Sequence, residues 1–112
     1  MQPESPKLLE DARLAAEFII RVTHGQTPAR YDSDEILRSA VERKFMIIGE
    51  AMVRLRKADP ATAEMLPDLY QIIAFRNILA HGYDVISNQR VWAVIENHLP
   101  VFLEAVTRML PT

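Results

Sequence analysis

The residues from 35 to 57 carry two adjacent apolar stripes, and this pattern constrains the fold more than any other feature of the chain. The first stripe contains Leu37, Val41, Ile48, Met52 and Leu55, and the second contains Ile36, Ala40, Ile47 and Ala51. Such spacing places each stripe along one side of an α-helix, and so wide an apolar surface contacts more than one neighbour, a second subunit included. Gly49 costs about 1 kcal/mol against Ala inside this helix, which predicts close approach by another backbone.

The rest of the chain is also predicted to be helical, because apolar residues recur at helical spacing and no strand-like alternation occurs. We expect a first helix capped by Ser5, with a proline at its first position and a stop near Gly25. A polar loop over residues 26–31 is expected to follow. Asp32 or Ser33 is then expected to cap the long helix.

Three further helices complete the prediction. A short helix starts at Asp59 and runs to about residue 65, and Pro67 opens the next one. Ser87 caps the last helix, in which Pro100 is expected to produce a kink. The expected fold is all-α, an antiparallel four-helix bundle with one additional short helix, formed as a single domain over residues 1–112.

Composition narrows the possible functions. The chain has 112 residues, a formal net charge of −2 and no cysteine. This charge argues against coating nucleic acid by bulk attraction but leaves a local basic cleft open. The lack of cysteine removes disulfide and thiolate chemistry and is compatible with the cytoplasm, where we expect the protein. No apolar run approaches the roughly 20 residues of a membrane span, and the histidines lack metal-ligand spacing, so neither membrane nor cofactor is expected.

Arg76 lies on the apolar face of its predicted helix. With Leu69 as the reference of a helical wheel, Ile73, Arg76 and Ala80 fall within about 40° of it. A guanidinium does not lose its proton, so burial is costly unless the side chain has a partner or lines a cleft. The position therefore indicates a paired or functional arginine.

His81 and Tyr83 follow Arg76 closely. His81 falls near the end of the helix, where the dipole favours a positively charged imidazole, and histidine is a common general acid or base. Arg76 presents planar donors that suit a phosphate. These two groups suffice for RNA cleavage without a metal, because one takes the proton of the ribose 2′-hydroxyl and the other stabilises charge on the attacked phosphate. Asn77 and Tyr83 can position the phosphate, and Tyr83 can also accept a covalent group.

A structural role accounts for the same residue types. A cation near a helix C-terminus is favourable, a histidine before glycine is an acceptable helix end, and a tyrosine after a helix often packs in a core. Structural ion pairs also perturb charged groups, so the residue types alone leave both interpretations open.

The stretch from Arg76 to Tyr83 resembles the signature of the HEPN superfamily (higher eukaryotes and prokaryotes nucleotide-binding), specifically of the HepT-like toxins. That signature is Arg, any four residues, His, any residue, Tyr, and Arg76, His81 and Tyr83 match it in full. Residues 40–51 are similar to the second helix of the family.

The resemblance extends from about residue 34 to residue 110. The pairs Val91-Trp92 and Leu99-Pro100 fall where the family has similar pairs. Relatives often carry a tryptophan shortly before the motif helix, where this chain has Leu66-Pro67-Asp68-Leu69-Tyr70. This departure concerns the wall of the cleft and the RNA specificity, not the catalytic pair.

The resemblance implies a HEPN-like bundle that forms a homodimer, with the two motifs facing each other across one cleft. It implies the toxin of a type VII-like HepT/MntA toxin–antitoxin system, a metal-independent ribonuclease that harms its host cell. The implied partner is an MntA-like nucleotidyltransferase antitoxin, which transfers AMP from ATP to the motif tyrosine. Carried over, Arg76 and His81 are catalytic, Tyr83 is the modified residue, and Asn77, Tyr83 and Glu50 position the RNA substrate.

Glu50 is an acid in an apolar part of the long helix. It can pair with Arg76 across the bundle, or with Arg43 seven residues earlier on the same helical face. It can also be a partly exposed acid at the rim of the helix, since buried acids are rare unless paired.

A second functional class fits the same residues. In it the bundle is a non-catalytic helical subunit that binds a nucleotide or a substrate for a nucleotidyltransferase, and Arg76 and His81 grip a phosphate without cleaving RNA. A plain dimerisation domain is a third possibility, but it leaves an arginine on an apolar face unexplained.

Overall fold

The computed structural model describes residues 1–82 and 86–111. Within these residues the chain forms helices and no strand, so the all-α prediction is confirmed. The helices are α1 (Ser5–Thr23), α2 (Pro28–Ser33), α3 (Glu35–Ala58), α4 (Pro60–Ala63), α5 (Leu69–His81), α6 (Asn88–Asn97) and α7 (Leu99–Met109).

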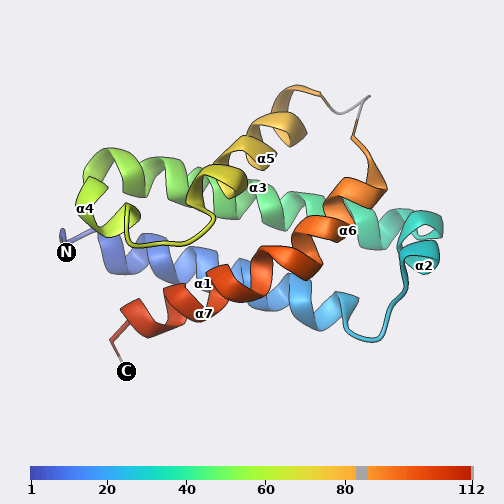
Figure 1. Ribbon diagram of the computed structural model, residues 1–112, viewed down its shortest axis with the longest axis horizontal. Helices are drawn as coiled ribbons and strands as arrows, with labels where there is room; N and C mark the ends of the chain where they lie inside the picture. Colours follow the sequence, from blue (N-terminus) through green and yellow to red (C-terminus); the bar gives the residue numbers. More distant parts are fainter. Residues whose placement is uncertain (83–85, 112) are drawn as a thin grey trace.

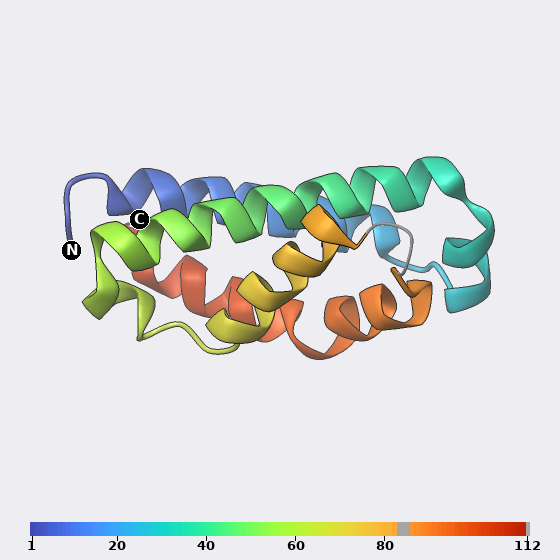
Figure 2. The ribbon, with the colours of Figure 1, turned by 90° about the horizontal axis from the view of Figure 1, so that it is seen from above.

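The two longest helices, α1 and α3, run antiparallel along the long axis of the molecule (Figure 1). In Figure 2 they form one layer, and α5, α6 and α7 lie along the other side. Helix α3 packs against both α1 and α5, and α7 packs against α1. The wide apolar surface predicted for the long helix is therefore shared between two neighbours within the same chain.

The core is built from the apolar faces of these helices. Fully buried side chains come from α1, α3, α5 and α7, with Leu9, Ile48, Ile72 and Phe102 among them. Both chain ends and α4 lie at one end of the bundle, and α2 lies at the other (Figure 1). None of the helices in the described part of the chain is long and apolar enough to cross a lipid bilayer.

Helix α2 was not expected from the sequence, and the predicted loop over residues 26–31 is therefore wrong in part. The hydroxyl of Thr27 accepts the backbone N–H of Arg30 at 3.1 Å, and Pro28 occupies the first turn. A threonine cap followed by proline is a recognised helix start, but the segment was predicted to be a loop because it is polar. The cap of α3 is consequently Asp34, whose carboxylate accepts the Leu37 N–H at 3.0 Å, rather than Asp32 or Ser33.

Other helix ends follow the sequence signals. Gly25 has a φ of 75°, the left-handed conformation that ends helices, just after α1. The hydroxyl of Ser87 accepts the Arg90 N–H at 3.3 Å and caps α6. Pro100 has a stronger effect than a kink, because the predicted last helix is divided at His98 into α6 and α7. Proline removes one helical hydrogen bond and suits the first turn of a new helix, which is its place in α7.

Asp59 ties the N-terminus to the start of α4. Its carboxylate accepts hydrogen bonds from the Thr62 hydroxyl at 2.6 Å, the Gln2 N–H at 2.9 Å and the Ser5 hydroxyl at 2.7 Å. These bonds, with the one from Thr62 foremost, hold the pKa of the buried Asp59 carboxyl well below its usual range. The expected cap at Ser5 is wrong, because its hydroxyl is bound to Asp59 and α1 begins at Ser5 itself.

Candidate active site at the crossing of α3 and α5

Helix α5 runs obliquely across α3 (Figure 2). Two buried aromatic rings meet where the helices pack. Phe45 of α3 and Phe75 of α5 meet edge to face, with ring centroids 5.0 Å apart. Aromatic pairs favour this geometry and gain energy beyond the area they bury. The pair fixes which residues of α3 and α5 come into contact next to it.

Gly49 leaves room for the side chain of Arg76. A Cβ atom added at Gly49 would overlap the Cβ and Cγ of Arg76. The Cβ of Arg76 is fixed by its backbone, so this overlap cannot be relieved while the helices stay in place. The sequence predicted a close approach at Gly49, but by another backbone, whereas the structure places the stem of a charged side chain there.

The guanidinium of Arg76 is held by two neighbours. Its Nε donates to Glu50 Oε1 at 3.1 Å, its Nη2 donates to the same oxygen, and its Nη1 donates to Asn77 Oδ1 at 2.9 Å. The Arg76 side chain is 22% exposed and that of Glu50 is 46% exposed. The cost of placing a cation among apolar neighbours is thus offset by a charge-assisted pair.

The terminal nitrogens of the guanidinium keep donors that Glu50 and Asn77 do not use. Each terminal nitrogen carries two N–H groups, and only one on each is engaged by Glu50 or Asn77. Among residues 1–82 and 86–111, the second N–H of Nη1 and of Nη2 has no acceptor. A planar pair of donors of this kind matches two oxygens of a phosphate.

The structure decides which of the possible partners Glu50 has. Its ion pair is with Arg76, 26 residues along the chain and on another helix. Among the described residues, no ion pair joins Glu50 to Arg43. The acid is also partly exposed, so it reaches Arg76 from the rim of α3 rather than from the core.

His81 is the last residue of α5 and is exposed to solvent. The N–H of the following Gly82 donates to the Ile78 carbonyl at 2.8 Å and closes the helix. Within the described residues, the imidazole makes no hydrogen bond or ion pair. It is therefore accessible to a bound molecule at the negative end of the helix.

Within the described residues, no hydrogen bond joins Arg76 and His81. Residues five apart on an α-helix are separated by about 140° around the axis and by about 7.5 Å along it. Arg76 faces α3 through Gly49 and Glu50, and His81 points into solvent. The structure therefore joins Arg76, Asn77 and Glu50 by hydrogen bonds, and His81 is not part of this bonded group.

Tyr83 lies outside the described residues, so its predicted roles are considered below as proposals. Among residues 1–82 and 86–111, no group of three or more His, Asp or Glu side chains could hold a metal ion.

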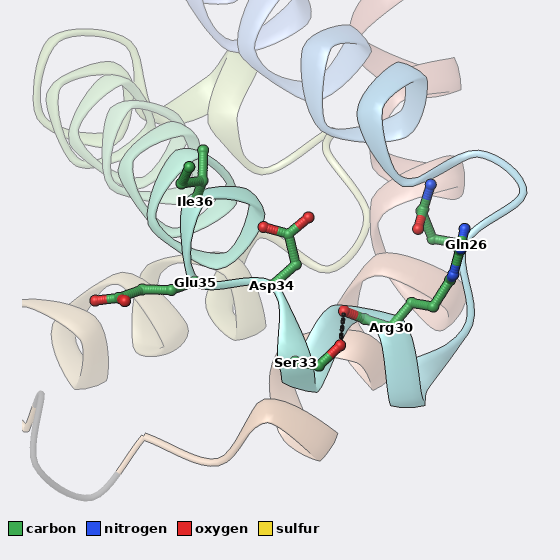
Figure 3. A pocket seen from close by; sticks show the side chains of 6 residues that line it. All are labelled: Gln26, Arg30, Ser33, Asp34, Glu35 and Ile36. Atoms are coloured by element: carbon green, nitrogen blue, oxygen red, sulfur yellow. Dashed lines mark hydrogen bonds between the residues drawn. The ribbon is translucent and has the colours of Figure 1, made fainter.

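A hollow of about 620 Å³ lies at the α2 end of the molecule, away from this cluster (Figure 3). Figure 3 shows Gln26 and Arg30 on one side of it and Asp34, Glu35 and Ile36 on the other. The Ser33 hydroxyl donates to the Arg30 carbonyl at 3.1 Å, which is a local turn contact. None of Glu50, Arg76 and His81 lines this hollow, so it is separate from the cluster at the helix crossing.

The similarity of the whole chain to known proteins bears on what this cluster does. A search of curated proteins and a search of solved structures gave no match to the chain. A family model described as "Ribonuclease HepT-like" matches residues 12–109, a range that contains the helix crossing and the whole of the motif from Arg76 to Tyr83. The chain therefore belongs to the HepT-like ribonuclease family.

Proposed function

We propose that the protein is the toxin of a type VII-like HepT/MntA toxin–antitoxin system and a metal-independent endoribonuclease. Arg76 and His81 are its catalytic residues, and Glu50 and Asn77 position Arg76. The observation that carries the proposal is a half-buried guanidinium, held by Glu50, with N–H groups that no described residue accepts and that suit a phosphate. Membership of a ribonuclease family supplies the substrate class.

The proposed reaction needs one base, one acid and one cation. His81 takes the proton of a ribose 2′-hydroxyl, and that oxygen forms a bond to the adjacent phosphorus. The bond from phosphorus to the 5′-oxygen breaks, and this oxygen receives a proton from a general acid. The products are a 2′,3′-cyclic phosphate and a 5′-hydroxyl. Arg76 stabilises the charge on the non-bridging phosphate oxygens in the transition state.

We infer that the active form is a homodimer. The chemistry supports this, because the reaction needs both a general base and a general acid, and the motif supplies one histidine per chain. A two-fold contact through this end of α5 would bring two copies of the motif together. His81 of the partner subunit would then serve as the general acid that completes the reaction.

The function is tested by incubating the purified, unmodified chain with RNA in excess EDTA. We expect cleavage to continue in EDTA and to leave cyclic phosphate and 5′-hydroxyl ends, because Arg76 and His81 supply the charge and proton transfer. Cleavage that stops on chelation and returns with a divalent ion would contradict metal independence. Intact RNA together with nucleotide binding would favour a binding subunit of a nucleotidyltransferase complex.

Regulation is proposed to act through Tyr83, two residues after His81. The phenolic oxygen attacks the α-phosphorus of ATP in a reaction catalysed by an MntA-like nucleotidyltransferase, and pyrophosphate leaves. The product carries a phosphodiester with about one negative charge beside His81. This charge repels an RNA phosphate and its bulk covers the site, so cleavage stops.

The modification is tested by intact mass after co-expression with the nucleotidyltransferase. We expect a gain of one or more AMP units that is lost in Tyr83→Phe. Tyr70→Phe is the matched control, because Tyr70 is an exposed tyrosine on α5. An unchanged mass, or a gain that Tyr83→Phe retains, would count against this site.

A further inference from the structure

The seam between α1 and α3 carries a groove that is lined in part by Glu50, the partner of Arg76. Two hollows of about 200 and 350 Å³ lie along it and share the lining residues Asp11 and Ile47, so they adjoin. Glu50, the carboxylate that holds Arg76, lines the first hollow. Together the two hollows form the α1/α3 groove. Its charged lining residues are Asp11, Arg21, Arg43, Lys44, Glu50 and Arg54.

The acids of the groove are already neutralised. Asp11 is paired with Lys7, and Glu50 is paired with Arg76. Within the described residues, the four cations Arg21, Arg43, Lys44 and Arg54 form no ion pair. The groove is therefore positively charged on a chain whose formal net charge is −2.

An aromatic ring holds two of these cations in place. Lys44 Nζ lies 4.8 Å from the centroid of the Phe18 ring, and the Arg21 guanidinium carbon lies 5.4 Å from it. Cations at this range are attracted by the face of the ring. Phe18 therefore keeps both charges along the seam.

The other two cations flank Glu50 on one face of α3. Arg43, Glu50 and Arg54 are spaced seven and four residues apart, so they share a face, and Arg43 lies about 16 Å from Arg54 along the axis. This distance lets them contact different phosphates of one strand. The Arg76–Glu50 pair is close to neutral overall, so it cannot attract a polyanion from a distance by itself.

We propose that the α1/α3 groove binds the backbone of single-stranded RNA and leads it to Arg76. This inference rests on the proposed ribonuclease function. Arg43 and Arg54 contact phosphates on either side of the one that Arg76 holds, and Arg21 and Lys44 extend the track along α1. The apolar floor at Ile47 suits the sugar and base faces that a single strand exposes.

The test measures RNA binding without cleavage. The double substitution Arg43→Ala/Arg54→Ala is made in a His81→Ala background, and a labelled single-stranded RNA is titrated by fluorescence anisotropy at several salt concentrations. We expect the Kd to rise roughly tenfold or more at low salt. We also expect the slope of log affinity against log salt to fall in magnitude by roughly 1.4, since two phosphate contacts are removed.

Arg30→Ala/Arg90→Ala is the matched control. Both are exposed cations on α2 and α6, outside the α1/α3 groove, and their loss changes the net charge equally. We expect this control to keep the Kd within about twofold and the salt slope unchanged. All four positions are exposed, so circular dichroism should show the same helix content in every variant.

The outcomes separate this proposal from the proposed function. Wild-type-like Kd and KM in Arg43→Ala/Arg54→Ala, with RNA cleavage intact, would overturn the groove and leave the ribonuclease standing. Salt-dependent, groove-dependent binding by a chain that never cleaves RNA would keep the groove and overturn the function. Loss of the homodimer in sedimentation, with RNA binding by the remaining species unchanged, would assign the face to a subunit contact and overturn the groove.

Discussion

His81→Ala is expected to lower the rate of RNA cleavage by roughly 10² to 10⁴-fold, the usual contribution of a general acid–base group. The substitution is expected to lower kcat and to change KM little, because Arg76 and the groove still bind the RNA. Single-turnover cleavage of a labelled RNA measures it directly.

The fold is expected to survive this substitution. His81 is exposed at the end of α5, and the bond that closes the helix is made by the backbone of Gly82. Urea unfolding should therefore give a midpoint close to that of the wild type. His24→Ala is the control, because His24 is also exposed and also lies at the C-terminal end of a helix. Full cleavage by His81→Ala would remove His81 from the mechanism.

Gly49→Ala is expected to damage stability and activity together. Ala gains about 1 kcal/mol in helix propensity, whereas overpacking a well-packed contact costs about 1–3 kcal/mol and occasionally more. The closest overlapping atom is the Cβ of Arg76, whose position is fixed by the backbone of α5 and does not change with the side-chain rotamer. The packing cost therefore exceeds the propensity gain, α5 moves away from α3, and Arg76 loses its bonds to Glu50.

Urea unfolding and the RNA cleavage rate together measure this effect. Ser39→Ala is the control for propensity alone, because Ser39 is exposed on the same helix. We expect Ser39→Ala to leave stability equal or raised and cleavage unchanged. A Gly49→Ala protein that is as stable as Ser39→Ala and cleaves RNA at the wild-type rate would show that the contact has no positioning role.

Local signals predicted most of the helices because helix starts and stops are determined by nearby residues. Asp59, Ser87 and Gly25 mark helix boundaries in the structure as in the sequence. The errors have local causes as well. Thr27 and Pro28 form a cap and first turn within a polar segment. The hydroxyl of Ser5 donates instead to the carboxylate of Asp59, which is 54 residues away in the sequence.

The sequence by itself determined that this chain is all-helical and that Arg76 occupies an unusual place on an apolar face, because helical periodicity is a property of neighbouring residues. Only the tertiary structure decided what Arg76 contacts. From the sequence, several acids were possible partners of Arg76. The structure pairs Arg76 with Glu50, because the packing of Phe45 on Phe75 places α5 against α3. Gly49 leaves room there for the first carbons of the arginine side chain. The α1/α3 groove has the same origin, since its charges come from two helices that only folding places side by side.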